Sequence, residues 1–145
     1  MADLGQVVTL YISDDAYNVL VEQARMAGFV KSDIARGMSG YIEWLMLHCT
    51  FTDTRPDDVK QADRDMMSQG YAPEWRMYGP RRRRNIKLSA GAMATASAEA
   101  ISLTIAHHPA RRMLGAPSYM DGPACMSAIL EALGTDWLKA EVTNE

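Results

Sequence analysis

The stretch Val7-Val8-Thr9-Leu10-Tyr11-Ile12-Ser13 alternates in character and runs directly into Asp14-Asp15. In an extended chain, one side carries Val8, Leu10 and Ile12, and the other side carries Val7, Thr9 and Tyr11. This period of two predicts a half-buried β-strand. Ser13 followed by two acidic residues is typical of a helix N-cap and first turn. We therefore expect a strand at residues 7–12 that leads without a loop into a helix.

Two helices are expected after this strand. The first ends near Ala27, and Gly28 suits the left-handed residue just past a helix end. Lys31 or Ser32 then opens a second helix, whose apolar stripe consists of Ile34, Met38, Tyr41, Ile42, Leu45 and Cys49. Gly37 and Gly40 lie inside it, where each costs about 1 kcal/mol relative to alanine. They indicate either simple tolerance or the close approach of another backbone.

The strand-to-helix pattern returns in Arg83-Arg84-Asn85-Ile86-Lys87-Leu88-Ser89. Aligning Ser13 with Ser89 gives an offset of 76 residues (89 − 13). Arg84 then takes the inward position of Val8, so we expect this second strand to be shorter or frayed. A helix is predicted over 90–106, followed by a long turn and a last helix over 121–134. Residues 136–139 indicate one further helical turn.

Residues 50–80 have a different character from both stretches. Thr50–Thr54 is polar and indicates a loop, and Arg55-Pro56-Asp57-Asp58 is typical of a helix start. Tyr71–Tyr78 combines aromatic residues with Pro and indicates an ordered connector. The predicted organisation is a first unit at 7–49, a connector with one helix at 50–80, and a second unit at 81–140. The two units are expected to share one core.

The first unit resembles the ribbon-helix-helix fold of the MetJ/Arc repressor class. The resemblance covers residues 7–48 without a gap and rests on the alternating strand, the Ser13 cap, Leu20, Ala24, Gly28 and Ser32-Asp33. It implies a mainly α fold with a short antiparallel β-ribbon, and the repeated pattern implies two tandem strand-helix-helix copies. Because one strand is half a ribbon, 7–12 pairs with 83–88 of the same chain or with a second chain. The protein is then a single-chain pseudo-dimer or a homodimer.

Composition narrows the function classes. The 145 residues are 48% hydrophobic with a net charge of −3, which suits a folded domain and does not favour a general nucleic-acid binder. Residues 1–80 carry seven Lys and Arg against twelve Asp and Glu, and residues 81–145 carry eight against six. No apolar run is long enough to cross a bilayer and no signal peptide is visible, so we expect a cytoplasmic protein without a membrane partner.

No catalytic constellation is found. The sequence has no glycine-rich phosphate loop and no nucleophile with a nearby base. His107-His108 point apart and lack a further ligand at suitable spacing, and a solvated helix face explains Asp57-Asp58. Cys49 and Cys125 are expected to be buried apolar groups. We therefore expect neither an enzyme, nor a metal, nor a cofactor.

The resemblance implies that the ribbon enters the major groove of double-stranded DNA. The implied base-contacting residues are Arg83, Asn85 and Lys87 of the second unit, with Val7, Thr9 and Tyr11 of the first. Arginine and lysine suit guanine, and asparagine suits adenine. The implied phosphate contacts are Arg81, Arg82, Lys31 and Ser32. The expected function is that of a sequence-specific repressor or an accessory factor of phage or plasmid type.

Two other interpretations stay open. Arg81–Arg84 is also typical of a solvated charge run, or of an ion-pair surface for the acidic first half. The chain is alternatively a protein-binding module, antitoxin-like or an inhibitor, that keeps this fold without binding DNA. Trp44 and Leu47 lie off the apolar stripe of their helix, which is consistent with a protein partner.

Overall fold

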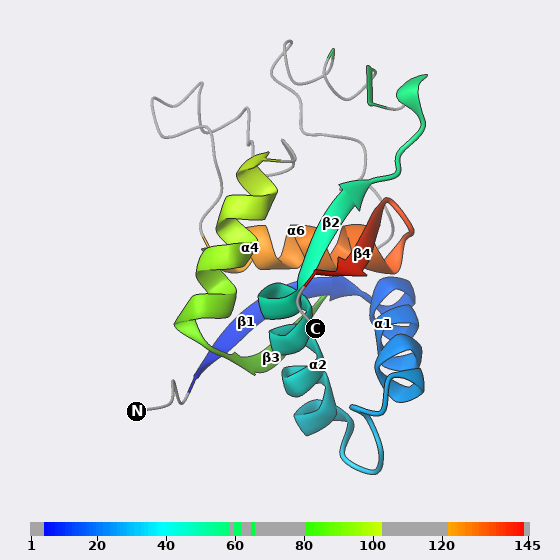
Figure 1. Cartoon of the computed structure of the whole chain (residues 1–145). Helices are drawn as coiled ribbons and strands as arrows, with labels where there is room; N and C mark the ends of the chain where they lie inside the picture. Colours follow the sequence, from blue (N-terminus) through cyan, green and yellow to red (C-terminus); the bar gives the residue numbers. More distant parts are fainter. Residues whose placement is uncertain (1–4, 59, 62–64, 66–80, 103–121, 144–145) are drawn as a thin grey trace.

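The computed structural model describes residues 5–58, 60–61, 65, 81–102 and 122–143, and it combines helices with two small antiparallel sheets of two strands each (Figure 1). The elements in chain order are β1 (Gln6–Ser13), α1 (Asp14–Met26), α2 (Ile34–His48), β2 (Cys49–Asp53), β3 (Arg81–Leu88), α4 (Ala90–Ser102), α6 (Gly122–Gly134) and β4 (Leu138–Val142). In Figure 1, α6 runs alongside β1, with α1 at one end of the ribbon and α4 at the other.

The first sheet is an antiparallel ribbon of β1 and β3 from the same chain. Its register runs from Gln6 opposite Leu88 to Ser13 opposite Arg81. Both strands have eight residues, so the expectation of a shorter or frayed second strand was wrong. The reason is that Arg84, although it faces inward, binds the Asp14 carboxylate and lies over the Tyr17 ring.

The second sheet pairs β2 with β4, where the sequence predicted a loop and a helical turn. Those two predictions were wrong. Cys49 and Phe51 of β2 and Leu138 of β4 are buried, and this burial favours strands because alternate residues point to one face. The ends of the sheet are closed by matching hydrogen bonds, Thr54 N–H to Trp137 O (3.0 Å) and Thr143 N–H to His48 O (2.9 Å).

The turn between α1 and α2 follows from its glycines. Gly28 has φ +89°, and Phe29 N–H donates to Ala24 O at 2.8 Å, so the predicted helix end is confirmed. A Cβ on Gly37 would lie 2.5 Å from Phe29 O, so the close approach of another backbone is confirmed there. Gly40 meets only ordinary contact, 3.5 Å from the Phe29 ring, which matches simple tolerance.

Helix boundaries elsewhere agree with the sequence in part. Ser13 caps α1 by accepting from Ala16 N–H at 3.2 Å, as predicted. Asp33, rather than Lys31 or Ser32, caps α2, which begins at Ile34. The predicted helices over 90–106 and 121–134 correspond to α4 and α6, and the long turn with His107-His108 lies outside the described residues. Lys60 N–H donates to Pro56 O at 3.0 Å at the predicted connector helix, and Tyr71–Tyr78 lies outside the description.

Both halves of the chain contribute to one hydrophobic core. Its largest fully buried apolar side chains are Leu10, Ile12, Leu20, Met38, Ile42, Leu88, Met126, Ile129 and Leu130. Cys49 and Cys125 are buried in it, as expected, and neither forms a disulfide among the described residues. Within the described parts of the chain, each helix is too short or too polar to span a membrane.

Candidate nucleic-acid interface

The outer face of the β1–β3 ribbon brings all six predicted base-contacting residues together. They form three cross-strand pairs, Val7 with Lys87, Thr9 with Asn85, and Tyr11 with Arg83. Val7 and Tyr11 are 71% and 52% exposed, and the three β3 residues are exposed as well. The alternate residues Leu10, Ile12, Ile86 and Leu88 are buried on the opposite face. The ribbon therefore has one core face and one solvent face.

The middle pair of this face lies on a local pseudo-twofold axis. Thr9 and Asn85 are 76 residues apart, which is the offset that aligns the two strands, and they are also partners across the ribbon. The same shift exchanges the outer pairs, since it takes Val7 to Arg83 and Tyr11 to Lys87. The Thr9 hydroxyl donates to Asn85 Oδ1 at 3.0 Å. The outer face is therefore symmetric in backbone and asymmetric in side chains.

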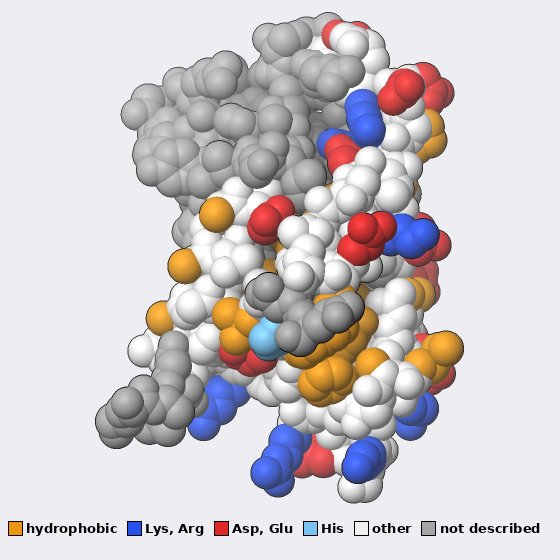
Figure 2. Space-filling view, viewed as in Figure 1, with side chains coloured by type: hydrophobic (Ala, Val, Ile, Leu, Met, Phe, Trp, Pro, Cys, Tyr) orange, Lys and Arg blue, Asp and Glu red, His pale blue; other side chains and the backbone are white. Residues whose placement is uncertain are grey.

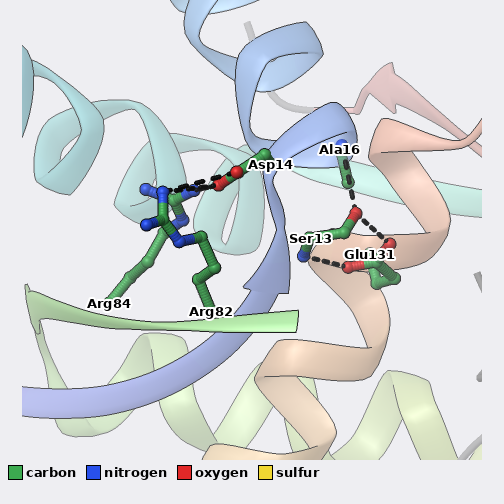
Figure 3. A network of polar contacts seen from close by, with 6 residues as sticks. All are labelled: Ser13, Asp14, Ala16, Arg82, Arg84 and Glu131. Atoms are coloured by element: carbon green, nitrogen blue, oxygen red, sulfur yellow. Dashed lines mark hydrogen bonds and ion pairs between the residues drawn. The ribbon is translucent and has the colours of Figure 1, made fainter. Parts of the chain in front are cut away.

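Two glutamates hold the points where the strands become helices. Ser13 donates from its N–H to Glu131 Oε1 at 2.8 Å and from its hydroxyl to Oε2 at 2.6 Å (Figure 3). Ser89 donates in the same way to Glu43, with its hydroxyl 2.8 Å from Oε2. Each glutamate comes from the other half of the chain. These contacts fix the ends of the strands and with them the side chains of the outer face.

Two serines hold the ribbon backbone from beneath. Ser127 Oγ of α6 accepts from Tyr11 N–H at 3.0 Å, and Ser39 of α2 donates to Lys87 O. The two contacts again cross between the halves of the chain. Tyr11 and Lys87 both lie on the outer face, so their backbone positions are set by hydrogen bonds from the core side.

Arg84 does not join the outer face. Its guanidinium binds the Asp14 carboxylate at 2.6 Å (Figure 3). It also lies over the Tyr17 ring, 3.7 Å from the ring centre. Arg82 also reaches Asp14, at 3.4 Å, although its side chain is 69% exposed. The ion-pair interpretation of the arginine run is thus confirmed for these two residues. Arg83 lies on the outer face instead.

Two of the four predicted phosphate contacts lie in the turn before α2. Lys31 and Ser32 are exposed and line a hollow of about 450 Å³ with Arg36 and Asp33. Asp33 accepts from Arg36 N–H at 3.1 Å, so a carboxylate already occupies part of this helix start and opposes an anion there. A second hollow, of about 320 Å³, includes Lys87 of the ribbon, and both hollows include Gly40.

Arg81 and Arg82, the other two predicted phosphate contacts, lie at the opposite end of β3 from Lys87, beside the start of α1. Arg81 pairs through its backbone with Ser13, and its side chain lies outside the description. In Figure 2, Lys and Arg side chains are prominent at the lower end of the visible face, over the α1–α2 turn and near β3. Basic side chains therefore lie at the α1–α2 turn and near β3 although the whole chain is acidic.

Sequence reasoning missed the residues that hold the ribbon in place. Asp14 was interpreted only as a favourable helix-start acid, and Tyr17, Glu43 and Glu131 were given no role. A signal existed for one of them. Glu131 is the single charged residue in the sequence of α6, and its side chain is 0% exposed. A lone acid on an apolar helix indicates a buried polar partner, because burying an unpaired charge is costly.

Cys49 and Asp53 have shifted pKa values that follow from burial and from a neighbouring arginine. Burial raises the pKa of the Cys49 thiol. Burial also tends to raise the pKa of Asp53, but the hydrogen bonds and charge of Arg55 outweigh it, so that pKa is lowered. Among the described residues, no three His, Cys, Asp or Glu side chains gather as metal ligands. His107 and His108 lie outside those residues.

Comparisons of the chain with protein-family models, with curated proteins and with solved structures gave no match. Function is therefore inferred from the side chains and geometry of the ribbon.

Proposed function

We propose that this chain is a tandem ribbon-helix-helix protein that binds double-stranded DNA by placing the outer face of the β1–β3 ribbon in the major groove. The observation that carries the proposal is the common placement of Arg83, Asn85 and Lys87 on one exposed ribbon face. A two-stranded ribbon fits the width of that groove, and its outward side chains meet the base edges. The tandem fold is supported by the Ser–Glu contacts that recur between the halves.

The three pairs on the outer face suit base recognition. Arg83 presents donors for O6 and N7 of guanine, Lys87 suits the same atoms, and Asn85 suits N6 and N7 of adenine. Val7 and Tyr11 offer apolar contact to thymine methyl groups. Because every basic residue of these pairs is on β3, we expect the two halves of the bound site to differ in sequence.

The outer face is held by contacts that exist without DNA. Glu131 and Glu43 fix the strand ends, and Ser127 and Ser39 fix the backbone beneath Tyr11 and Lys87. A face that is already ordered loses less conformational entropy on binding. Asp14 is paired with Arg84 and Arg82, which offsets its repulsion of phosphate.

The experiment that tests the proposal is selection of random duplexes on the purified full chain. We expect enrichment of one asymmetric motif, with affinity that falls steeply as salt rises, since phosphate contacts release counterions. Recovery of no motif, together with binding that does not respond to salt, would contradict the proposal. A repressor or an accessory factor is then distinguished by whether the motif lies at promoters or elsewhere.

A second candidate is a protein-binding module, antitoxin-like or an inhibitor. The observation that favours it is the exposure of Val7 and Tyr11 on the same face as the basic residues. Exposed apolar groups of this size are also found at protein contacts. A stoichiometric protein partner that protects Tyr11, with no DNA motif selected, would favour this candidate over DNA binding.

A further inference from the structure

We infer that the pairing surface of each half of the chain is built for the other half and rejects a copy of itself. The surface concerned is the ribbon with the helix ends beside it, and the partner that fits it is the opposite half. This inference concerns assembly and does not depend on DNA binding. It rests on two contacts that break the local symmetry, one charged and one steric.

The correspondence between the halves is set by contacts that occur twice. Ser13 with Glu131 matches Ser89 with Glu43, so second-helix positions correspond at an offset of 88 (131 − 43). Ser39 and Ser127 give the same offset (127 − 39) and contact Lys87 and Tyr11. Strand and first-helix positions correspond at 76, as Thr9 and Asn85 do.

The charged contact rejects pairing between two second halves. Arg84 binds Asp14 and lies over Tyr17, both from the first half. The corresponding residues of the second half are Ala90 and Met93, which offer neither a carboxylate nor an aromatic ring. Arg84 is only 21% exposed, and its Nε is buried with no hydrogen-bond partner among the described residues. Two second halves would therefore leave each Arg84 without the carboxylate and the ring that hold it here, which is unfavourable for a mostly buried guanidinium.

The steric contact rejects pairing between two first halves. Gly134 of α6 lies on the start of α1, where a Cβ would be 2.5 Å from Ala16 O and 2.6 Å from Ala16 Cα. Backbone atoms cannot move aside as the end of a side chain can. The residue that corresponds to Gly134 in the first half is Met46, at the offset of 88 (134 − 46). Two first halves would therefore lose the close contact that Gly134 makes with Ala16 and would have the larger Met46 at that position instead.

The Arg84 contact disfavours pairing of two second halves, and the Gly134 contact disfavours pairing of two first halves. The contacts that occur in both halves do not distinguish between pairings. Both halves carry the capping serine, the second-helix serine and the glutamate, so those groups stabilise any pairing equally. Selection between pairings falls on Arg84 and on Gly134 with Met46. Unpaired charge and steric conflict against the wrong partner are the general means of such selection.

The pseudo-twofold axis supplies a reporter for the test in the full chain. Paired Cα atoms in an antiparallel ribbon lie about 4.5–5.5 Å apart, within reach of a disulfide. Cysteine is introduced by Thr9→Cys, by Asn85→Cys, or by both, in a chain that also carries Cys49→Ala and Cys125→Ala. Mild oxidation is followed by non-reducing electrophoresis. Pairing of two first halves links two copies of position 9, and pairing of two second halves links two copies of position 85.

We expect the double variant to oxidise within one chain and each single variant to give only traces of linked dimer. The selecting residues are then changed one at a time. Arg84→Val should raise the amount of dimer linked at position 85 by about tenfold or more. A tenfold change corresponds to about 1.4 kcal/mol, and leaving a buried charge without its partner typically costs more than that. Arg84→Val should leave dimers linked at position 9 much less changed. Met46→Ala should have the converse effect.

The control is to measure each of the two substitutions, Arg84→Val and Met46→Ala, with both cysteine reporters. If Arg84→Val raised both kinds of dimer equally, it would have loosened the intrachain ribbon without selecting a partner, and the inference would be wrong. Abundant self-linked dimers in either single variant of the otherwise unchanged chain would also overturn it. Arg84→Met repeats the test with a side chain nearer in length to arginine, and circular dichroism identifies the folded variants to be compared.

Discussion

The backbone N–H and the hydroxyl of Ser13 both donate to the carboxylate of Glu131, which lies 118 residues later in the chain. Ser13 is at once the last residue of β1 and the N-cap of α1. One buried carboxylate therefore holds the ribbon, the helix start and α6 together. Ser89 and Glu43 repeat the arrangement at the other end of the ribbon.

Removing either glutamate should destabilise the fold. Hydrogen bonds to charged groups contribute about 1.5–3 kcal/mol each in typical proteins, and Glu131→Ala also leaves buried donors without their acceptor. We expect Glu131→Ala to lower the free energy of unfolding by at least about 2 kcal/mol. Urea denaturation measures it, with Glu141→Ala on the exposed face of β4 as the control. Equal stability of the two variants would show that the Ser13 contact adds nothing.

Replacing the two glycines of α2 by alanine should change the free energy of unfolding in opposite directions. Gly40→Ala should raise the free energy of unfolding by up to about 1 kcal/mol, because alanine favours helix and the nearest atom allows ordinary contact. Gly37→Ala should lower it by about 1–3 kcal/mol, since the new Cβ would overlap Phe29 O. Thermal and urea unfolding of both variants test this. A stabilised Gly37→Ala would mean that the α1–α2 turn is free to shift.

The Asp53–Arg55 pair should make stability depend on pH in the acid range. Arg55 lies 2.6 Å from Asp53 and lowers the pKa of that carboxyl below its ordinary value of 3.8. A lowered folded-state pKa gives stability that is present above the ordinary value and is lost as pH falls through the lowered one. Asp53→Asn should therefore be less stable than the unchanged chain at pH 7. The gap should narrow below pH 3.8.

That prediction is checked by urea unfolding of both chains between pH 7 and the acid limit of folding. A gap in stability that stays constant over the whole range would contradict a contribution from the ionised carboxyl. Asp57→Asn, at an exposed position nearby, controls for a general loss of negative charge.

Lysines on the two sheets should differ in their effect on DNA binding. Lys87 on β3 and Lys139 on β4 are both exposed strand residues. Lys87→Ala should weaken binding to a selected duplex, because it removes a side chain suited to guanine, and the loss of its positive charge should reduce the slope of log affinity against log salt. Lys139→Ala should leave affinity and slope unchanged. Titrations at several salt concentrations make the comparison, and equal losses would indicate a purely non-specific charge effect.

Local patterns were enough to predict much of the fold. The alternation in residues 7–12 identified β1 and its two faces, and Ser13 and Gly28 identified the ends of α1. The same period of two in residues 83–88 assigned Arg83, Asn85 and Lys87 to one side. These features depend on neighbours within a few residues, and sequence spacing contains that information.

The features that were missed depend on distant partners. Residues 50–54 were predicted as a loop and residues 136–139 as a helical turn. Residues 49–53 and 138–142 form strands instead because each provides the other's hydrogen bonds. Arg84 in an inward position predicted a frayed strand because its partner, Asp14, lies 70 residues earlier. The roles of Glu43 and Glu131 likewise follow only from the pairing of the two halves.

The most direct test of DNA binding by the outer face is the affinity of Arg83→Ala and Asn85→Ala for a duplex selected by the unchanged chain. Loss of a side chain that contacts a base edge typically costs about 1–3 kcal/mol, so each variant should bind about 5- to 150-fold more weakly. Lys139→Ala should bind as the unchanged chain does. Affinity of both ribbon variants equal to that of Lys139→Ala would contradict the account.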